Sequence, residues 1–228
     1  MPVIRDIKLE LPFEQLLRRE GFRKHVSPSP AIQKVILEML NNLEHDSLLE
    51  PVIAYEIMPV ERMINDEQGT GRISRQNSRI FSVISGAREL AAAVCTIGKK
   101  LEMQVKQFIE SNEPLRALLM DGIGSAAVDI LSEEACNLIS SAASLRGYMA
   151  GSPISPGMQG LSITEQTRIF ELVPASEIGV SLTDSGMMIP LKSASMVMGL
   201  GPEMKRWKRV EVCASCHLRS SCPYRLEI

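Results

Sequence analysis

The clearest hydrophobic pattern in the chain lies between residues 90 and 108. Apolar residues recur there at spacings of three and four over about five turns, which is the period of one helix face. They are Leu90, Val94, Ile97, Leu101, Val105 and Phe108. The pattern predicts a long helix that packs against the core.

A second long helix is predicted to begin at Glu113-Pro114. Its apolar residues also share one side, and they are Leu119, Ile123, Ala126, Ile130 and Leu138. Small side chains allow another backbone to approach closely, so a cluster of them favours tight helix packing first and a ligand surface only second. The cluster comprises Gly122, Gly124, Ser125, Ala126 and Ala127.

The sequence pattern in the N-terminal part of the chain predicts two shorter helices and part of a sheet. Ser29-Pro30 has the form of an N-cap followed by proline at the first helical position. The expected elements, in order, are a helix over Leu11–Glu20, a helix from Pro30, a strand over Val52–Val60, a polar surface loop over Asn65–Asn77 and a strand over Arg79–Ser85.

A turn and a short helix are predicted after residue 150. Ser155-Pro156-Gly157 is a turn signal, because proline fixes φ and glycine adopts positive φ without strain. Ser162, followed three residues later by Glu165, is typical of a helix start, and Pro174 should end that helix.

Strands should follow the short helix. Residues alternate at Ile178, Val180 and Leu182, and after a break at residues 183–186 an apolar run ends at Pro190. The whole order is two helices, sheet, two long helices, loop and sheet. This order predicts an α+β fold rather than alternating βαβ units.

Composition narrows the function classes. The chain has 228 residues, 45% hydrophobic and 23% charged, with a formal net charge of −2. We expect one domain over residues 1–204 and a cysteine-bearing tail over residues 205–228. The charge balance argues against a nucleic-acid partner. The apolar runs are too short for a membrane span, and the N-terminus lacks a signal-peptide pattern, so we expect a cytoplasmic protein.

Three cysteines in the tail form a candidate metal site. Cys213, Cys216 and Cys222 follow the spacing C-x2-C-x5-C, which brings soft thiolate ligands within reach of one zinc ion or iron-sulfur cluster. A fourth ligand is needed, and the candidates are His217, Cys95, Cys136 or an external group. Cys95 and Cys136 lie in apolar patterns, where buried free thiols are the simpler interpretation.

Two other interpretations of the tail are weaker. A disulfide is disfavoured in a reducing compartment. The string from Cys213 to His217 also satisfies the C-x-x-C-H pattern of covalent haem attachment. Such attachment normally accompanies export, for which the sequence gives no sign.

A longer match is carried by Ser155-Pro156-Gly157, Gln166–Leu172, Ile178–Ser185, Met188-Ile189-Pro190 and Ser193-Ala194-Ser195. These residues resemble the activation domain of cobalamin-dependent methionine synthase. The agreement runs without gaps over about 40 positions, which makes it far more specific than a lone glycine motif. Weaker similarity extends upstream to about Gly86, so the resemblance covers roughly half of the chain.

The resemblance implies a fold, a ligand and a partner. The fold would be α+β, with a curved antiparallel sheet flanked by helices. The ligand would be S-adenosylmethionine, contacted by Ser155, Pro156, Gly157, Met158 and Asp184. The chain would act as a free-standing activation subunit for a partner methyltransferase that carries cobalamin, where it supports reductive remethylation of cob(II)alamin during methionine biosynthesis.

The chain departs from the family at two positions. Pro153 stands where the family has an arginine that holds the carboxylate of the ligand, and Met158 replaces a tyrosine. Arg146 lies seven residues upstream and could swing in to replace that arginine, although a solvated surface arginine is the simpler interpretation. A second hypothesis therefore stays open: a metal- or iron-sulfur-bearing redox partner of corrinoid proteins that has lost S-adenosylmethionine binding.

Overall fold

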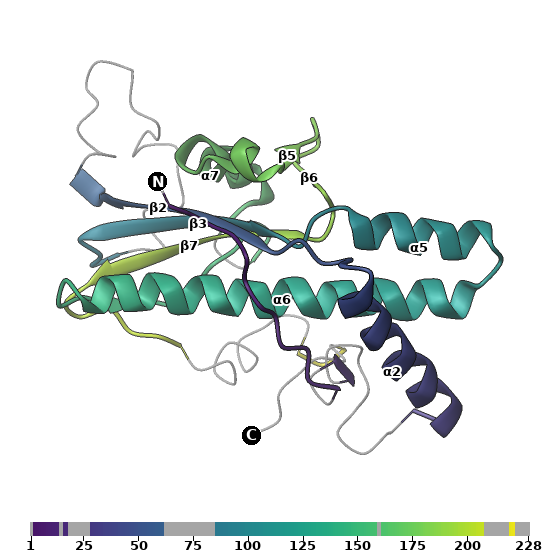
Figure 1. Cartoon of the computed structure of the whole chain (residues 1–228). Coiled ribbons are helices and arrows are strands. Elements are labelled where there is room, and N and C mark those ends of the chain that lie inside the picture. The colour runs from purple at the N-terminus through teal and green to yellow at the C-terminus, as the bar shows by residue number, and fades with distance from the viewer. Residues whose placement is uncertain are drawn as a thin grey trace.

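The computed structural model describes residues 2–13, 16–17, 28–61, 85–158, 161–207 and 219–221. The described residues form a curved antiparallel sheet of five strands with helices on both faces (Figure 1). In spatial order the strands are β1 (Val3–Ile4), β2 (Val52–Pro59), β3 (Glu89–Thr96), β7 (Ser193–Gly201) and β4 (Met149–Ala150). The α+β fold and the curved antiparallel sheet are confirmed.

Helices and a small hairpin complete the described fold. The α-helices are α2 (Pro30–His45), α5 (Lys100–Glu110), α6 (Pro114–Ser144) and α7 (Gln166–Leu172). The short 3-10 turns are η1 (Ile163–Glu165) and η2 (Ala175–Ile178), and the hairpin consists of β5 (Ser181–Leu182) and β6 (Met188–Ile189). None of the described helices has both the length and the apolar character that a membrane span requires.

The two central strands separate two hydrophobic cores. Along β3, Ala91, Ala93 and Cys95 face the core beneath α6. The alternate residues Leu90 and Val94 belong to the core beneath α7. Successive side chains of a strand point to opposite faces, so β3 and its neighbour β7 are covered on both sides.

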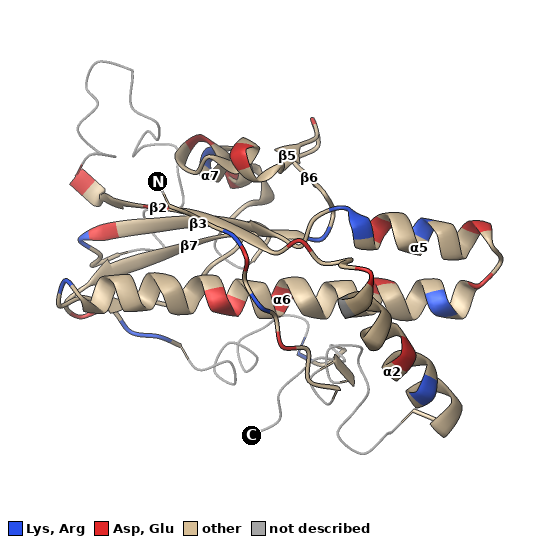
Figure 2. Cartoon of the chain, in the orientation of Figure 1, with Lys and Arg blue, Asp and Glu red and all other residues tan. Residues whose placement is uncertain are grey.

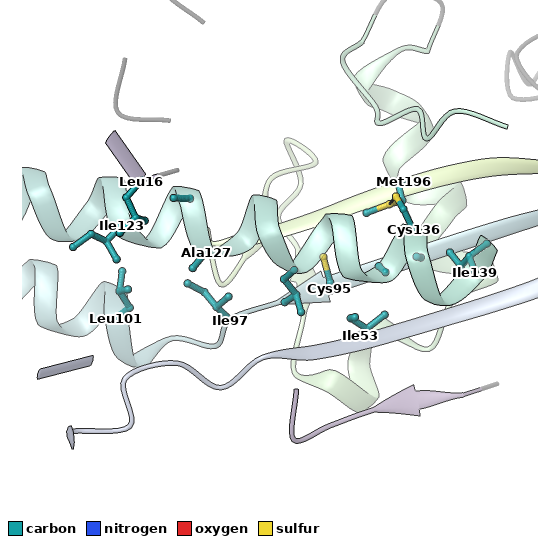
Figure 3. Close-up of a cluster of buried hydrophobic side chains, with 14 of the residues drawn as sticks. Leu16, Ile53, Cys95, Ile97, Leu101, Ile123, Ala127, Cys136, Ile139 and Met196 are labelled. Carbon is teal, nitrogen blue, oxygen red and sulfur yellow. Dashed lines mark hydrogen bonds between the residues drawn. The ribbon is translucent and has the colours of Figure 1, made fainter. Parts of the chain in front are cut away.

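The first core lies under α6, which runs along one face of the sheet with α5 beside it (Figure 1). Figure 3 shows part of this cluster, with Leu101 of α5 near Ile123 of α6. A Cβ added to Gly124 would lie 2.6 Å from Leu101 Cδ2. The prediction that the small residues serve tight helix packing is therefore confirmed at Gly124.

The second core lies on the opposite face, under α7 and η2 (Figure 1). Ile169 and Leu172 of α7 are buried against Leu90 and Val197 of the central strands. This layer connects directly to the segment that carries the predicted turn. The outer surfaces of both layers carry charges of both signs (Figure 2).

The predicted helix over residues 90–108 is wrong, because residues 89–96 form strand β3 and the helix α5 begins only at Lys100. A central strand covered on both faces is apolar throughout, so any spacing, including a helical one, can be picked from it. Gly98 separates the two elements at φ +79°, and a Cβ there would lie 2.8 Å from Glu50 Oε2.

Other N-terminal predictions are largely confirmed. Helix α2 starts at Pro30, and Ser29 Oγ accepts the N–H of Ile32 at 3.4 Å. Strand β2 matches the predicted strand within one residue. Of the helix expected over Leu11–Glu20, the described residues 13, 16 and 17 are helical. The loop predicted over residues 65–77 and most of the strand predicted over residues 79–85 lie outside the described residues, and Ser85 is in a turn.

The C-terminal predictions are confirmed for the helices and wrong in two details. Helix α6 begins at Pro114, as predicted, but Leu138 is 36% exposed and lies outside its apolar face. Ile178 closes η2 instead of starting a strand, so β5 begins only at Ser181. The predicted N-cap at Ser162 is confirmed, since its Oγ accepts the N–H of Thr164 at 3.3 Å.

The contact between α5 and α6 can be tested by filling it. We expect Gly124→Val to lower the free energy of unfolding by about 1–3 kcal/mol, because the added methyl groups collide with Leu101 and overpack the contact. Urea denaturation measures the change. The control is Asn137→Val on an exposed position of the same helix, which should be nearly neutral. Equal effects of the two variants would contradict the packing account.

Candidate functional site

The predicted loop leaves the sheet at its β4 edge. Ile154 and Val197 of β7 exchange two backbone hydrogen bonds of 2.9 Å, which form an isolated bridge beyond β4. Ser155 follows directly. The loop Ser155–Met158 is therefore held at a fixed position on the edge of the sheet, next to the centre of β7.

The Ser155-Pro156-Gly157 turn is confirmed. Met158 N–H donates to Ser155 O at 3.0 Å, which closes a four-residue turn. Gly157 has φ +92°, a conformation that other residues rarely adopt. A second pair of bonds, Gly157 N–H to Leu161 O at 2.9 Å and Leu161 N–H to Met158 O at 3.0 Å, joins the turn to the start of η1.

The loop lies at the surface. Gly157 and Met158 are exposed, whereas Ser155 and Pro156 are half-buried. The side chain of Met158 folds back, and its Sδ accepts the N–H of Ser155 at 3.4 Å. The carbonyl oxygens of Pro156 and Gly157 accept no hydrogen bond from any described residue. A carbonyl oxygen carries partial negative charge, which favours a cationic ligand group nearby.

A buried polar pair lies near the loop, where η1 passes into α7 over the sheet. Ser195 Oγ of β7 donates to Gln166 Oε1 at 3.2 Å, and both side chains are buried. Glu165, the preceding residue, is also buried, and its Oε2 lies 3.5 Å from Arg168 Nε. The sequence marks Glu165 as part of a helix start and places Gln166 and Ser195 within the resemblance, but it does not predict the contact between Gln166 and Ser195. The signal that marks them is a polar side chain at an inward position of an apolar strand and helix.

Asp184 lies on the β5–β6 hairpin and not on the loop. It is exposed in the turn of the β5–β6 hairpin, where Thr183 N–H bonds Met187 O at 2.9 Å and Thr183 Oγ1 lies 2.9 Å from Ser185 Oγ. Among the described residues, no hydrogen bond or ion pair joins Asp184 to residues 155–158. Its contribution to ligand binding stays a prediction.

A surface pocket of about 400 Å³ lies between α7, η2 and β5. It is lined by residues 170–176 and 180–181 and includes neither Asp184 nor the loop Ser155–Met158. Most of the lining residues are apolar, and the polar ones are Glu171, Ser176 and Ser181. This pocket is an alternative ligand position on the same layer, and an experiment that locates a ligand can distinguish it from the loop.

Arg146 is exposed, as expected from the sequence. Its Nη2 and Nε also lie 3.0 and 3.2 Å from Glu89 Oε2, at the start of β3. An ion pair at this exposure contributes little stability. Among the described residues, no hydrogen bond or ion pair joins Arg146 to the loop Ser155–Met158.

The cysteines divide into two groups. Cys213, Cys216 and Cys222, together with His217, lie outside the described residues. Cys95 of β3 and Cys136 of α6 are buried free thiols, as predicted, and Figure 3 shows Cys136 beside Met196. Cys136 Sγ donates to Met196 Sδ at 3.4 Å. Within the described part of the chain, no cluster of His, Cys, Asp and Glu side chains is arranged to hold a metal.

The fold is shared with a protein of known structure. The chain is similar to the crystal structure of the MetH reactivation domain bound to AdoHcy, with a TM-score of 0.59 and 15% sequence identity. The alignment covers 91% of this chain and 81% of that chain. No protein-family model matches the chain, and the curated proteins contain no match. The comparison therefore supports the resemblance at the level of the fold.

The buried thiol of Cys95 predicts a pH dependence of stability. Burial raises the pKa of Cys95 from 9.0 to about 11. The unfolded chain therefore ionises first, and the stabilising contribution, complete below pH 9, is lost as the pH rises from 9 to 11. Between pH 9 and pH 11, we expect the free energy of unfolding to fall further in the protein with Cys95 than in the Cys95→Ala variant, and the difference should be on the order of 2 kcal/mol. Both proteins carry serine in place of the three tail cysteines. The same pH dependence of the unfolding free energy in the two proteins would contradict the raised pKa of Cys95.

Proposed function

We propose that this chain binds S-adenosylmethionine at the loop Ser155–Met158. In that complex it presents the methyl group to a cobalamin carried by a separate methyltransferase. The reaction served is the reductive remethylation of cob(II)alamin: a one-electron donor reduces the cobalt, the sulfonium methyl is transferred to it, and S-adenosylhomocysteine leaves. The chain itself supplies binding and orientation and no nucleophile.

The observation that carries the proposal is a surface proline-glycine turn directly after Ile154, which exchanges two backbone hydrogen bonds of 2.9 Å with Val197 of β7. The turn occurs in a fold shared with a domain that was crystallised with AdoHcy. A turn fixed in this way keeps its shape without a ligand. A preorganised loop saves the entropy that a mobile loop would lose on binding.

The chemistry of the loop suits a sulfonium nucleoside. The carbonyls of Pro156 and Gly157, which accept no hydrogen bond from a described residue, are dipoles that favour a positive group. A Cβ at Gly157 would meet only Ile163 Cδ1, at 3.9 Å, so a ligand can approach the backbone closely there. We assign Ser155, Pro156, Gly157 and Met158 as ligand contacts. Asp184, at the hairpin tip, is proposed as a further contact to the positively charged part of the ligand.

A second candidate function rests on the tail. The C-x2-C-x5-C spacing of Cys213, Cys216 and Cys222 favours a zinc ion or an iron-sulfur cluster. In this alternative the chain keeps the activation fold, has lost S-adenosylmethionine binding, as Pro153 and Met158 allow, and serves corrinoid proteins as a metal-bearing redox partner. Under the first function instead, an iron-sulfur cluster in the tail would supply the electron that remethylation needs.

Titration calorimetry with S-adenosylmethionine tests the loop. We expect binding to the native chain and a dissociation constant about tenfold higher for Gly157→Val, because a Cβ makes positive φ cost roughly 1–2 kcal/mol. Gly147→Val is the matched control: it also has positive φ (+72°) and open space at the Cβ, but lies at the end of α6. It should leave the dissociation constant unchanged.

Either of two results would count against the proposal. The first is the absence of binding heat with the native chain, which would favour the metal-bearing alternative. The second is equal weakening by the two glycine variants, because that result would locate the effect in general stability instead of the loop.

Metal analysis of anaerobically purified protein tests the tail. We expect about one metal site per chain, seen either as zinc or as iron with visible absorption. Cys216→Ser should lose most of the metal, because the change removes one of three thiolates. Cys95→Ser should retain it, since Cys95 is buried under α6. Equal metal contents in all three proteins would exclude the tail site.

A further inference from the structure

The pocket between α7, η2 and β5 is not part of the loop site. Its volume of about 400 Å³ is large enough to hold a side chain of another molecule. Among its lining residues, the buried ones are apolar, namely Leu172, Val173, Ala175 and Val180. The polar ones, Glu171, Ser176 and Ser181, are exposed. The pocket is therefore an apolar hollow with a polar border at the surface.

Strand β5 has one edge that no described strand covers. It pairs with β6 on its other side, and the described hairpin contains only these two strands. Hydrogen-bonded and non-hydrogen-bonded pairs alternate along an antiparallel ladder. Thr183 N–H donates to Met187 O at 2.9 Å, so the next pair, Leu182 with Met188, is a non-hydrogen-bonded one. The N–H and C=O of Leu182 therefore point away from β6.

The uncovered edge of β5 borders the pocket. Backbone groups two residues apart in a strand point the same way, and Val180 N–H, two residues before Leu182, donates to Ala175 O at 3.0 Å. Val180 and Ala175 both line the pocket, and Figure 1 shows the hairpin beside α7. A free strand edge beside a pocket is the arrangement that accepts an extended peptide: the edge bonds its main chain, and the pocket takes one of its side chains.

The surface around this edge is acidic. Residues 161–191 contain one cation, Arg168, and four carboxylates, which are Glu165, Glu171, Glu177 and Asp184. Arg168 pairs with Glu165. Arg5 approaches from β1, but its Nη2 donates to the backbone oxygen of Glu177 at 2.8 Å. In the described part of the chain, the carboxylates of Glu171 and Glu177 have no ion-pair partner. Figure 2 shows the red positions on this layer. A basic partner would complement this charge.

We propose that the edge of β5 is a docking site for an extended segment of a partner protein in which apolar and basic residues alternate. The segment adds a third antiparallel strand beside β5 and bonds to the N–H and C=O of Leu182. One apolar side chain enters the pocket, and a lysine or arginine lies near Glu171. This inference goes beyond the proposed function and does not require it, because neither the edge nor the pocket includes the loop Ser155–Met158.

A synthetic peptide tests the docking site. The probe is fluorescein-labelled KVKLKVK, whose basic and apolar side chains lie on opposite faces of a strand. Fluorescence anisotropy with the native chain should show saturable binding, with a dissociation constant on the order of 100 µM. The peptide EVELEVE has the same apolar residues and the opposite charge, and it should bind at least about tenfold more weakly.

Amide exchange at Leu182 distinguishes strand addition from other modes of binding. Saturating KVKLKVK should slow exchange of the Leu182 amide, followed by NMR, about tenfold or more, because its N–H gains an acceptor. The Val180 amide, already bonded to Ala175 O, should change little. n-Octylamine has an apolar chain and an ammonium group but no peptide backbone, so it should leave the Leu182 amide unchanged even where it fills the pocket.

Variants locate the site on the surface. Glu171→Lys reverses the charge beside the pocket, and Ser176→Phe fills the pocket; each should raise the dissociation constant of KVKLKVK about tenfold. The matched controls are Glu134→Lys and Ser141→Phe at exposed positions of α6, and both should bind like the native chain. Thermal unfolding checks that each variant is folded. If Ser176→Phe does not fold, Glu171→Lys and the Leu182 amide decide the matter.

Four results would overturn the inference. They are no binding of KVKLKVK to the native chain, an unchanged dissociation constant for folded Glu171→Lys, an unchanged Leu182 amide at saturating peptide, and a dimer of the native chain that Glu171→Lys dissociates. The third result, together with tight binding of n-octylamine, would assign the pocket to a small amine. The fourth would assign the edge to a second copy of this chain. None of these results bears on S-adenosylmethionine binding at the loop, which is measured separately.

Discussion

Strand β7 determines where every element near the candidate site lies. It bonds to β3 along one side, and on the other side to β4 and to Ile154. Its alternating side chains belong to two cores, with Met196 and Met198 under α6 and Val197 under α7. Strand β7 fixes the position of the loop Ser155–Met158, because the bridge between Ile154 and Val197 is the last sheet contact before the turn.

The two layers give the molecule two different surfaces. The α6 layer is built for packing, and Gly124 lets α5 approach closely there. The α7 layer carries the features that the proposed function assigns to the ligand, which are the exposed turn and the hairpin with Asp184, and α7 is joined to β7 by the buried pair of Gln166 and Ser195. In this account the first layer supplies stability and the second supplies recognition.

The sequence predicts features whose causes are local. Ser29 and Pro30 start α2 because an N-cap acts on the next few residues, and Gly157 marks the turn because only a few residues accept positive φ. The segment from Leu90 to Thr96 is misassigned because a strand buried on both faces carries no alternation. The hydrogen bond between Ser195 and Gln166 joins residues 29 positions apart, and the one between Trp207 and Ser152 joins residues 55 positions apart. No local sequence pattern predicts contacts at such separations.

Amide hydrogen exchange with and without S-adenosylmethionine tests the central claim, that the sheet edge at β7 presents the ligand loop. The account predicts slower exchange on ligand binding in the peptide that covers residues 154–158. It predicts no change in the peptide that covers the pocket at residues 170–181. Slower exchange confined to the pocket, with residues 154–158 unaffected, would contradict it.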